Sequence, residues 1–267
     1  MQTDAVQAWQ NDRRRRSFDE VAELYDRARP GYPPELLGDL SALAGLDAGS
    51  RVLEVGPGTG QLTVALASSG FRIVAVELGG DLARILERNV AAFENVEIAR
   101  TAFEDWPLSH EPFDLVVFAT AFHWIEPAVR LVKSATALKP GGALAIIRTR
   151  PIAGGSPRFA ELATPCYRRW IEADAFDLPD RDSIPVDREL DDSPLFMDEA
   201  RRTYVRDLTF TSREYVDLLA TWSPNRALTE PARAGLLTCL EQLIDSHFDG
   251  SVTMTHLSEL QVARKRA

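Results

Sequence analysis

The sequence predicts an α/β protein built on a doubly wound, largely parallel sheet. Short runs rich in valine, isoleucine and leucine alternate with segments whose apolar residues recur at helical spacing. The first of these runs leads directly into a turn that contains three glycines. Such alternation builds a parallel sheet between helices, and it places a bound ligand at the carboxyl ends of the strands.

The individual elements follow from the apolar spacing and the turn residues. Apolar side chains from Phe18 to Tyr25 predict a helix over residues 17–28, which the proline-rich segment 29–34 ends before a second helix over 35–44. The core follows with strands expected near residues 51–55, 72–77, 95–100, 112–118 and 142–149. Helices are expected between them near residues 60–69, 81–92 and 127–138.

The region after residue 150 has a different character. Residues 157–174 have helical spacing, and the segment 178–197 contains many aspartates, serines and prolines, which predicts a loop or lid. Alternating polar and apolar residues predict strands at 204–210 and 251–257. Further helices are expected from a capped start at Thr211 and over roughly 229–246.

The glycine turn is the most informative segment of the chain. It runs through VLEVGPGTG at residues 52–60, so Glu54 precedes Gly56, Gly58 and Gly60. Glycines let the main chain approach a ligand closely, and the adjacent carboxylate favours a ligand that carries positive charge. A dinucleotide-binding fingerprint requires a third glycine at position 61, which is Gln61 here. A purely structural turn and a nicotinamide dinucleotide site are the alternatives.

The second predicted strand ends in Glu77, and Gly79 and Gly80 open the next helix. A carboxylate at this strand tip can accept both hydroxyls of a ribose, and an adenosine ribose occurs in several cofactors. A solvated surface acid is the alternative interpretation of Glu77.

The strand, acid and glycine pattern resembles the class I S-adenosylmethionine (SAM)-dependent methyltransferases. The resemblance extends from about Phe18 to Arg264 and implies a Rossmann-like sheet of seven strands with a terminal antiparallel strand pair. It also implies SAM as cofactor, with Glu54 and the glycines at its methionine part and Glu77 at its ribose. In this family the loop after the third strand holds adenine, usually with an aspartate that this sequence lacks; Phe103 is instead a candidate to stack on the purine or to belong to the core. The expected cofactor-binding residues are Glu54, Gly56, Gly58, Gly60, Gln61, Glu77, Leu78, Ala102, Phe103, Glu104, Ala119 and Phe122.

The segment at the end of the fourth predicted strand, Ala121-Phe122-His123-Trp124, resembles the small-molecule branch of the family that contains trans-aconitate methyltransferase. His123 is a candidate catalytic base because imidazole titrates near neutrality, and a packing role is the alternative. Trp124 is a candidate substrate contact or pocket wall. The step Leu138-Lys139-Pro140-Gly141-Gly142 resembles the family's connection from helix to strand, in which the glycines mark a turn.

The resemblance implies one methyltransferase domain over residues 1–267. Within it, residues 1–47 form a helical cap, 48–150 the SAM-binding core, 151–200 a substrate-side insertion, and 201–267 the final strands and helices. The cap is expected to fold over the donor. The predicted substrate or lid residues are Tyr25, Arg29, Tyr32, Trp124 and Arg148, with Arg150 as a further candidate for binding a carboxylate.

Composition excludes several classes of protein. The 267 residues carry 30 basic and 40 acidic side chains, a net charge of −10, which opposes a nucleic acid as the main substrate. Arg13 to Arg16 form one basic run that could meet a small anionic substrate. Cys166 and Cys239 lie far apart and predict neither a metal site nor a disulfide. A reducing, cytoplasmic location without signal peptide or membrane span is therefore expected.

These observations predict a SAM-dependent methyltransferase that acts on a small molecule, with O-methylation of a carboxylate as the leading hypothesis. An NAD(P)-dependent oxidoreductase and a non-catalytic SAM-binding subunit are the alternatives. The oligomeric state and the identity of the acceptor have no signal in the sequence.

Overall fold

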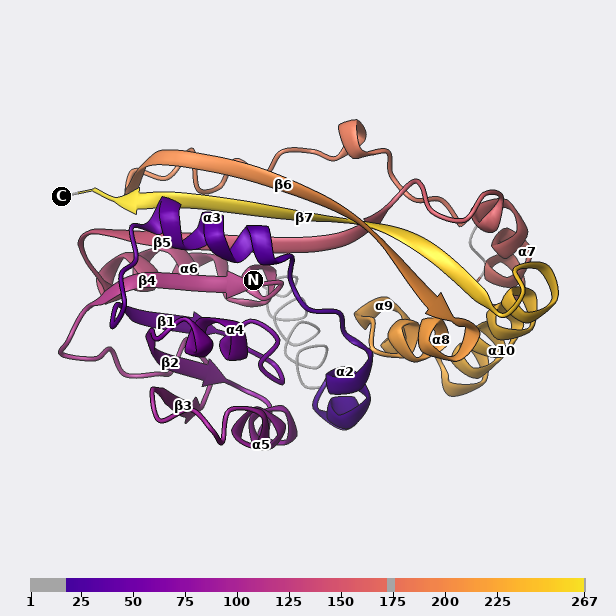
Figure 1. Ribbon diagram of the computed structural model, residues 1–267, viewed down its shortest axis with the longest axis horizontal. Helices are drawn as coiled ribbons and strands as arrows, with labels where there is room; N and C mark the ends of the chain where they lie inside the picture. The colour runs from indigo at the N-terminus through magenta and orange to yellow at the C-terminus, as the bar shows by residue number, and fades with distance from the viewer. Residues whose placement is uncertain (1–17, 172–175, 267) are drawn as a thin grey trace, which may run out of the picture. The chain divides into compact units, whose positions relative to one another are not determined.

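The computed structural model describes residues 18–171 and 176–266 (Figure 1). The strands are β1 (Arg51–Val55), β2 (Arg72–Glu77), β3 (Val96–Arg100), β4 (Phe113–Ala119), β5 (Leu138–Ile152), β6 (Phe196–Thr211) and β7 (Ser251–Lys265). The helices are α2 (Ala22–Ala28), α3 (Pro34–Ala44), α4 (Thr63–Ser68), α5 (Gly80–Asn89), α6 (Pro127–Ala137), α7 (Phe159–Ile171), α8 (Ser212–Ala220), α9 (Ser223–Arg226) and α10 (Glu230–His247). Short 3-10 turns are η1 (Asp19–Val21), η2 (Phe122–Trp124) and η3 (Arg181–Ser183).

The strands of the described residues form one seven-stranded sheet in the order β3-β2-β1-β4-β5-β7-β6. The pairs β1/β2, β2/β3, β1/β4 and β4/β5 are parallel. Figure 1 shows β7 running opposite to β5 and β6, so the sheet is mixed. The predicted fold class is therefore confirmed, because the strand order reverses at β1, the topological switch point at which such sheets bind ligands.

The chain divides into two compact units, and each has its own core. The described residues of the sheet unit fall within Pro30–Thr149, Val186–Tyr204 and Ser258–Ala267, and those of the helical unit fall within Met1–Arg29, Arg150–Pro185 and Val205–Leu257. The strands β5, β6 and β7 contribute residues to both units.

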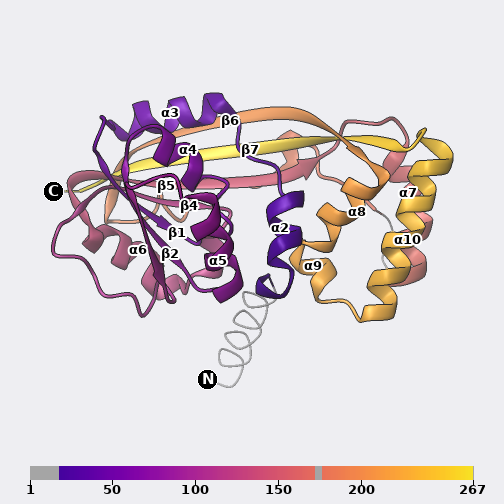
Figure 2. The same ribbon diagram turned by 60° about the horizontal axis from the view of Figure 1, so that its bottom comes forward.

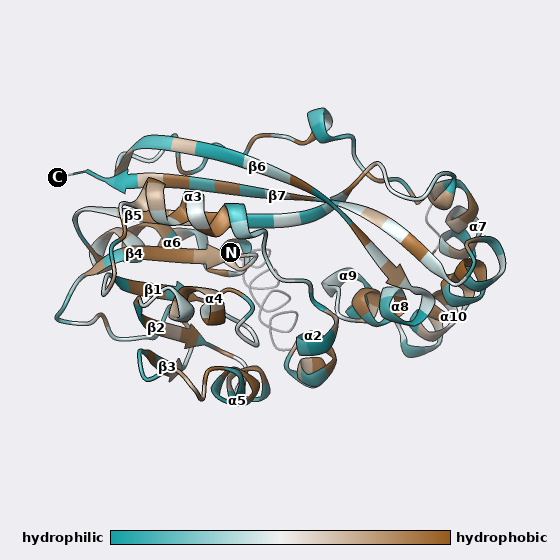
Figure 3. Ribbon diagram, in the orientation of Figure 1, coloured by the Kyte–Doolittle hydropathy of each residue, from teal (hydrophilic) through white to brown (hydrophobic). Residues whose placement is uncertain are grey.

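Alternate side chains of the central strands enter two apolar layers of the sheet unit. Val52, Ile73 and Val117 belong to a layer that contains the apolar faces of α3, α4 and α5. Leu53 and Val116 belong to the other layer, which includes residues of α6. Because β1, β2 and β4 are buried on both faces, runs of apolar residues form most of each strand, as Figure 3 shows in brown. This double burial explains why their positions were predicted to within a residue.

The expected turn at Gly141 and Gly142 is wrong, because these residues lie inside β5. The pairing with β4 shifts between Phe113, opposite Leu138, and Leu115, opposite Ala143. The segment between those pairs is therefore a bulge, and Gly141 adopts φ +71° within it. A glycine pair that suggests a turn from sequence is here an irregularity of a continuous strand.

β6 and β7 are much longer than predicted, since they begin or end well outside 204–210 and 251–257. β6 is the last strand of the sheet, and most of its side chains are exposed or half-buried. An edge strand of this kind contains many polar residues, and Figure 3 shows them in teal. The sequence consequently did not predict the first half of β6 as a strand.

The core of the helical unit is formed by α7, α8 and α10, which Figures 1 and 2 show side by side. Phe159, Tyr215 and Leu240 are among its buried residues. The predicted capped start of α8 is confirmed: Glu214 N–H donates to Thr211 Oγ1 at 3.2 Å, and Thr211 N–H donates to the Glu214 carboxylate at 2.9 Å. None of the helices in the described ranges combines the length and apolar character that crossing a bilayer requires.

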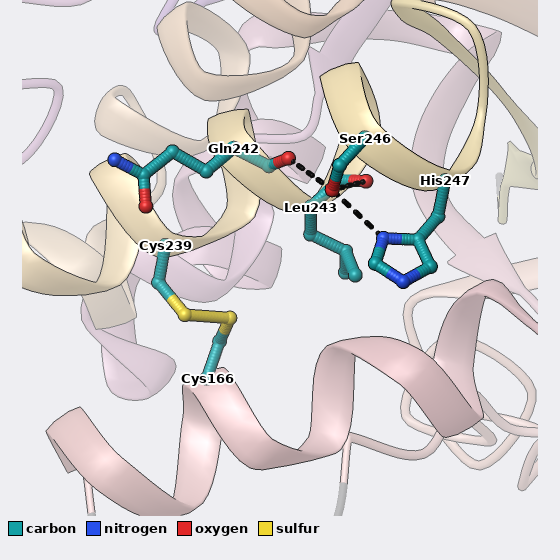
Figure 4. The surroundings of a disulfide bond; sticks show 6 residues. All are labelled: Cys166, Cys239, Gln242, Leu243, Ser246 and His247. Carbon is teal, nitrogen blue, oxygen red and sulfur yellow. Dashed lines mark hydrogen bonds between the residues drawn. A yellow bond between two sulfur atoms is a disulfide. The ribbon is translucent and has the colours of Figure 1, made fainter.

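The prediction that Cys166 and Cys239 stay unpaired is wrong, because they form a disulfide. Figure 4 shows the bond between α7 and α10, close to Leu243 and Ser246. The two residues are 73 positions apart, and only the packing of α7 on α10 brings them together. Sequence spacing therefore carried no signal for the pair.

Replacement of both cysteines by serine is expected to lower the free energy of unfolding by about 2–4 kcal/mol, because the bond closes a long loop of the unfolded chain. Urea denaturation followed by circular dichroism measures the change. Dithiothreitol should lower the free energy of unfolding of the natural chain by the same amount and leave that of the double variant unchanged. Equal midpoints for the oxidised natural chain and the double variant would contradict the prediction.

Candidate functional site

The carboxyl ends of β1 and β2 bring two acids together on one face of the sheet. Glu54 pairs with Ala75 across β1 and β2, and Glu77 follows two residues later on β2. Positions two apart on a strand face the same side, so Glu54 and Glu77 both lie on the α4 and α5 side of the sheet. Both acids therefore lie near the carboxyl ends of the parallel strands, where sheets of this kind bind ligands.

Glu54 is buried and unpaired. Its side chain is 1% exposed, and neither carboxylate oxygen has a hydrogen-bond partner among the described residues. Burial raises the pKa of Glu54 to about 7; the charge of Glu77 adds to the shift, and the neighbouring Thr63 hydroxyl opposes it without reaching hydrogen-bond geometry. A buried acid without a partner is a site for a cationic group.

Glu77 holds the loops on either side of it. One carboxylate oxygen accepts a hydrogen bond from Gly58 N–H at 2.9 Å, and the other accepts one from Gly79 N–H at 2.8 Å. Glu77 thus connects the glycine turn to the start of α5. Each carboxylate oxygen has a second lone pair, so the acid retains capacity for further donors.

The glycine turn has no room for larger residues at two positions. Gly56 adopts φ +69°, and a Cβ atom there would lie 2.7 Å from Ala121 Cβ. Gly60 adopts φ +100°, and its Cβ would lie 2.6 Å from Leu86 Cδ1. The turn is further held by Asn89, whose side-chain amide donates to the Thr59 carbonyl oxygen at 2.8 Å.

These residues fit SAM. The unpaired Glu54 carboxylate suits a cationic group, and the bare backbone around Gly56 allows close approach. Gln61 lies beside the turn, with its side-chain amide donating to Thr59 Oγ1 at 2.7 Å. Leu78, half-buried, follows Glu77 at the tip of β2.

The loop after β3 places its three predicted residues in different environments. Ala102 is half-buried. The Phe103 ring is buried and packs edge-on against Phe118 with ring centroids 5.8 Å apart, which favours the core interpretation. A Glu104 carboxylate oxygen accepts from Glu126 N–H at 3.2 Å. Of these three residues, Ala102 and Glu104 retain some exposure.

The tip of β4 contributes Ala119, Thr120 and Phe122. Ala119 is half-buried, whereas Phe122 is buried and packs edge-on against Phe118 with ring centroids 5.2 Å apart. Thr120 adopts φ +59°, which is unfavourable for a β-branched residue. Its hydroxyl lies 3.4 Å from the hydroxyl of Tyr32, a predicted lid residue. Strained backbone of this kind occurs mainly at functional sites.

The remaining predicted site residues of the sheet unit contact other side chains of the protein. His123, exposed on η2, lies against the half-buried Trp124, with ring centroids 4.6 Å apart. Arg148 forms an ion pair with Asp187 and donates to Gln261 Oε1 at 3.2 Å. Its charge is therefore partly neutralised within the protein.

Tyr25, Arg29 and Arg150 belong to the helical unit. The Arg29 guanidinium lies 4.9 Å from the centroid of the Tyr25 ring. The basic run Arg13 to Arg16 lies outside the described residues.

Sequence reasoning missed Thr63 and the conformation of Thr120. The Thr63 hydroxyl is buried beside Glu54, and no partner for it exists in the described part of the chain. The position of Thr63, three residues after the last glycine, gave no indication of the face it occupies. A left-handed threonine likewise has no sequence signature.

The comparisons with known proteins agree with this geometry. Residues 52–142 match the sequence model of a family described as "Methyltransferase domain". An uncharacterized methyltransferase of Mycobacterium tuberculosis is 37% identical over 131 residues, which cover 49% of this chain and 51% of that protein. The chain thus matches about half the length of this curated relative.

Two solved structures share the fold. The Bacillus subtilis protein YcgJ superposes with a TM-score of 0.52 at 15% identity, covering 87% of this chain and 99% of that one. A Haemonchus contortus N-methyltransferase, solved with phosphomonomethylethanolamine and S-adenosylhomocysteine, has a TM-score of 0.51 at 19% identity, covering 93% of this chain and 58% of that one. Residues 52–142 thus match a methyltransferase domain, and the chain shares the fold of these two structures.

Proposed function

We propose that the protein transfers a methyl group from SAM to a small organic molecule, and that the reaction is O-methylation of a carboxylate. The observation that carries the proposal is the buried, unpaired carboxylate of Glu54 beside the glycine turn that Glu77 holds. When bound, SAM supplies an activated methyl group on a positively charged sulfur. The proposed activity is of the kind that the trans-aconitate methyltransferase branch carries out.

Each residue has a proposed role. Glu54, Gly56, Gly58, Gly60 and Gln61 bind the methionine part of the donor, and Glu77 with Leu78 binds its ribose. Ala102 and Glu104 border the adenine, whereas Phe103 belongs to the core. Ala119 and Phe122 close the site beside the adenine. Tyr32, Trp124 and Arg148 contact the acceptor.

A carboxylate acceptor removes the need for a strong base. Carboxylates are ionised at neutral pH, so no proton leaves the nucleophilic oxygen during methyl transfer. Rate enhancement then comes mainly from holding acceptor and donor in line, with water excluded. His123 becomes a base only for an acceptor that carries a proton, such as a phenol or an amine.

The small-molecule assignment is supported by charge. A net charge of −10 repels a polyanion, so RNA and DNA are disfavoured as acceptors. The Haemonchus contortus enzyme, which shares the fold, was solved with a small molecule, phosphomonomethylethanolamine.

The function is tested with the full chain and SAM labelled in its methyl group. Carboxylates, phenols, amines and ribosomal RNA are screened as acceptors. Carboxylates should become labelled, and mild alkali should release the label as methanol, because only a methyl ester hydrolyses in this way. A label that resists alkali would contradict carboxylate O-methylation and would indicate methyl transfer to another kind of group. Donor binding with no labelled acceptor would favour the non-catalytic subunit.

Glu77→Ala is expected to weaken SAM binding by about 1–3 kcal/mol, because buried donors of the turn and of the ribose lose their acceptor. Calorimetric titration measures the change. Glu97→Ala is the matched control, since Glu97 is an exposed carboxylate on β3. If Glu77→Ala binds the donor as tightly as Glu97→Ala does, the ribose role of Glu77 is refuted.

A further inference from the structure

Arg148 lies on β5 at the level where the neighbouring strand β4 ends. Ile147, the residue before it, pairs with Ala119, and the Ile147 carbonyl oxygen accepts from Thr120 N–H at 2.8 Å. The Arg148 guanidinium carbon lies 5.9 Å from the centroid of the Phe122 ring. All of these residues belong to the sheet unit. Arg148 is therefore at the carboxyl ends of the parallel strands, where sheets of this kind bind ligands.

Two other segments of the sheet unit hold the Arg148 guanidinium. Nη2 forms an ion pair with the Asp187 carboxylate, and Nη1 donates to Gln261 Oε1 at 3.2 Å. Gln261 is buried, and its amide nitrogen donates to Asp191 Oδ1 at 3.4 Å. This second contact turns the Gln261 oxygen toward Arg148. Gln261 thus fixes the direction of the guanidinium, and the position beside Nη2 already accommodates a carboxylate.

The Asp187 side chain is the exposed partner of this pair. It is 40% exposed, whereas the Arg148 side chain is 20% exposed. Residues 181–189 include no buried residue, and the first one after them is Leu190. A segment with so few buried contacts opens locally at low cost, and water reaches the Asp187 carboxylate.

The main chain around Asp187 is held by contacts that do not involve Arg148. The Asp187 carbonyl oxygen accepts from Arg201 Nη2 at 2.7 Å. The Glu189 carboxylate forms a two-point ion pair with Arg130, in which Nε–H donates to Oε1 at 2.7 Å and Nη2 contacts Oε2. Arg130 in turn donates to the Phe122 carbonyl oxygen at 3.2 Å. A rotation of the Asp187 side chain therefore uncovers Arg148 while these contacts stay in place.

We propose that Asp187 is a built-in occupant of a carboxylate-binding site at Arg148, and that a small organic carboxylate binds there by displacing it. The incoming carboxylate accepts from the same guanidinium, which Gln261 keeps in position. A carboxylate fits better than a phosphate, because the position is already shaped by the planar group of Asp187.

The built-in occupant also sets the selectivity of the site. Asp187 is present at a high effective concentration, so a free anion competes well only if it makes further contacts. Simple anions are therefore bound weakly by the natural chain. That the displacing carboxylate is the methyl acceptor rests on the proposed function; the binding itself does not.

Calorimetric titration of the full chain with benzoate, without SAM and at constant ionic strength in chloride, tests the site. Asp187→Asn should bind benzoate at least about tenfold more tightly than the natural chain, because the competing charge is gone. Arg148→Gln added to Asp187→Asn should remove the gain. The proposal is overturned if Asp187→Asn gains no affinity, if the gain survives the loss of Arg148, or if Asp187→Asn binds inorganic phosphate as tightly as benzoate.

Asp192→Asn is the matched control for the removal of one negative charge. Asp192 lies on the same segment and pairs with Arg188, and both side chains are 69% exposed. This variant should bind benzoate within about twofold of the natural chain. An equal gain in Asp192→Asn and Asp187→Asn would show an effect of overall charge and would refute a specific role for Asp187.

Circular dichroism checks the folding of each variant. If Arg148→Gln prevents folding, Arg148→Lys is combined with Asp187→Asn instead. Lysine keeps the charge and lacks the planar donors, so most of the gain should still be lost. Benzoate binding as tight as in Asp187→Asn alone would remove Arg148 from the site.

Methyl transfer from labelled SAM is measured separately. A carboxylate that becomes methylated should have a lower KM in Asp187→Asn than in the natural chain, and an unchanged KM would overturn the assignment of this site to the acceptor. Benzoate binding stands or falls independently of whether any acceptor is methylated.

Discussion

Glu54→Gln is expected to stabilise the donor-free protein by about 3 kcal/mol above pH 7 while it weakens the binding of SAM. The pKa of Glu54 rises from 4.5 to about 7 on burial, so the folded state favours the protonated acid. Stability from this group is therefore complete below pH 4.5 and is lost as the pH rises to about 7. Glutamine mimics the protonated acid at every pH.

Chemical denaturation of both proteins at pH 4.5 and pH 8, without donor, measures the effect. The difference should be small at the lower pH and reach its full value at the higher one. Glu97→Gln, which removes an exposed carboxylate, is the control and should change little. A less stable Glu54→Gln protein at pH 8 would show that Glu54 has a stabilising partner.

A comparison of two ligands identifies which positive charge of SAM contacts Glu54. SAM carries a sulfonium, whereas S-adenosylhomocysteine carries a neutral thioether and the same ammonium group. Titration of Glu54→Gln with both ligands should give weaker binding of each if the ammonium contacts the acid. A selective loss of SAM would assign Glu54 to the sulfonium. Loss of neither ligand would remove Glu54 from the site.

Gly56→Ala is expected to lower the free energy of unfolding and the free energy of donor binding by about 2–5 kcal/mol in total. The backbone at φ +69° is unfavourable for alanine, and the added methyl group would lie 2.7 Å from Ala121 Cβ. Calorimetric titration and urea denaturation measure the two parts. Gly38→Ala is the control, because Gly38 lies in α3 with nothing within 4 Å of its added Cβ.

A double variant separates the two causes. Ala121→Gly removes the atom that the new methyl group would meet, so Gly56→Ala combined with Ala121→Gly should recover the steric part and retain the backbone part. If Gly56→Ala alone binds the donor like the natural chain, the close approach of the turn is not needed for binding.

The parts of the fold that were predictable are those in which local pattern and burial agree. β1, β2 and β4 are buried on both faces and bounded by turns, so their apolar runs coincide with the strands. The first half of β6 was not predicted as a strand, because an edge strand contains many polar side chains. The turn predicted at Gly141 was wrong, because a bulge and a turn both favour glycine.

The candidate site was predictable only in part. Glu54 and Glu77 follow from their places at strand ends, because parallel strands bring such positions to one edge. Glu54 has no hydrogen-bond partner among residues 18–171 and 176–266, and Arg148 is paired with Asp187. Both facts depend on segments that are distant in sequence.

The disulfide also determines what proteolysis can release. The loop segment 177–195, between α7 and β6, lies inside the stretch that Cys166 and Cys239 enclose. A protease that cuts this segment once leaves one fragment with Cys166 and the other with Cys239. The two pieces remain covalently joined, so a nicked molecule runs as a single species on a gel until a thiol separates it.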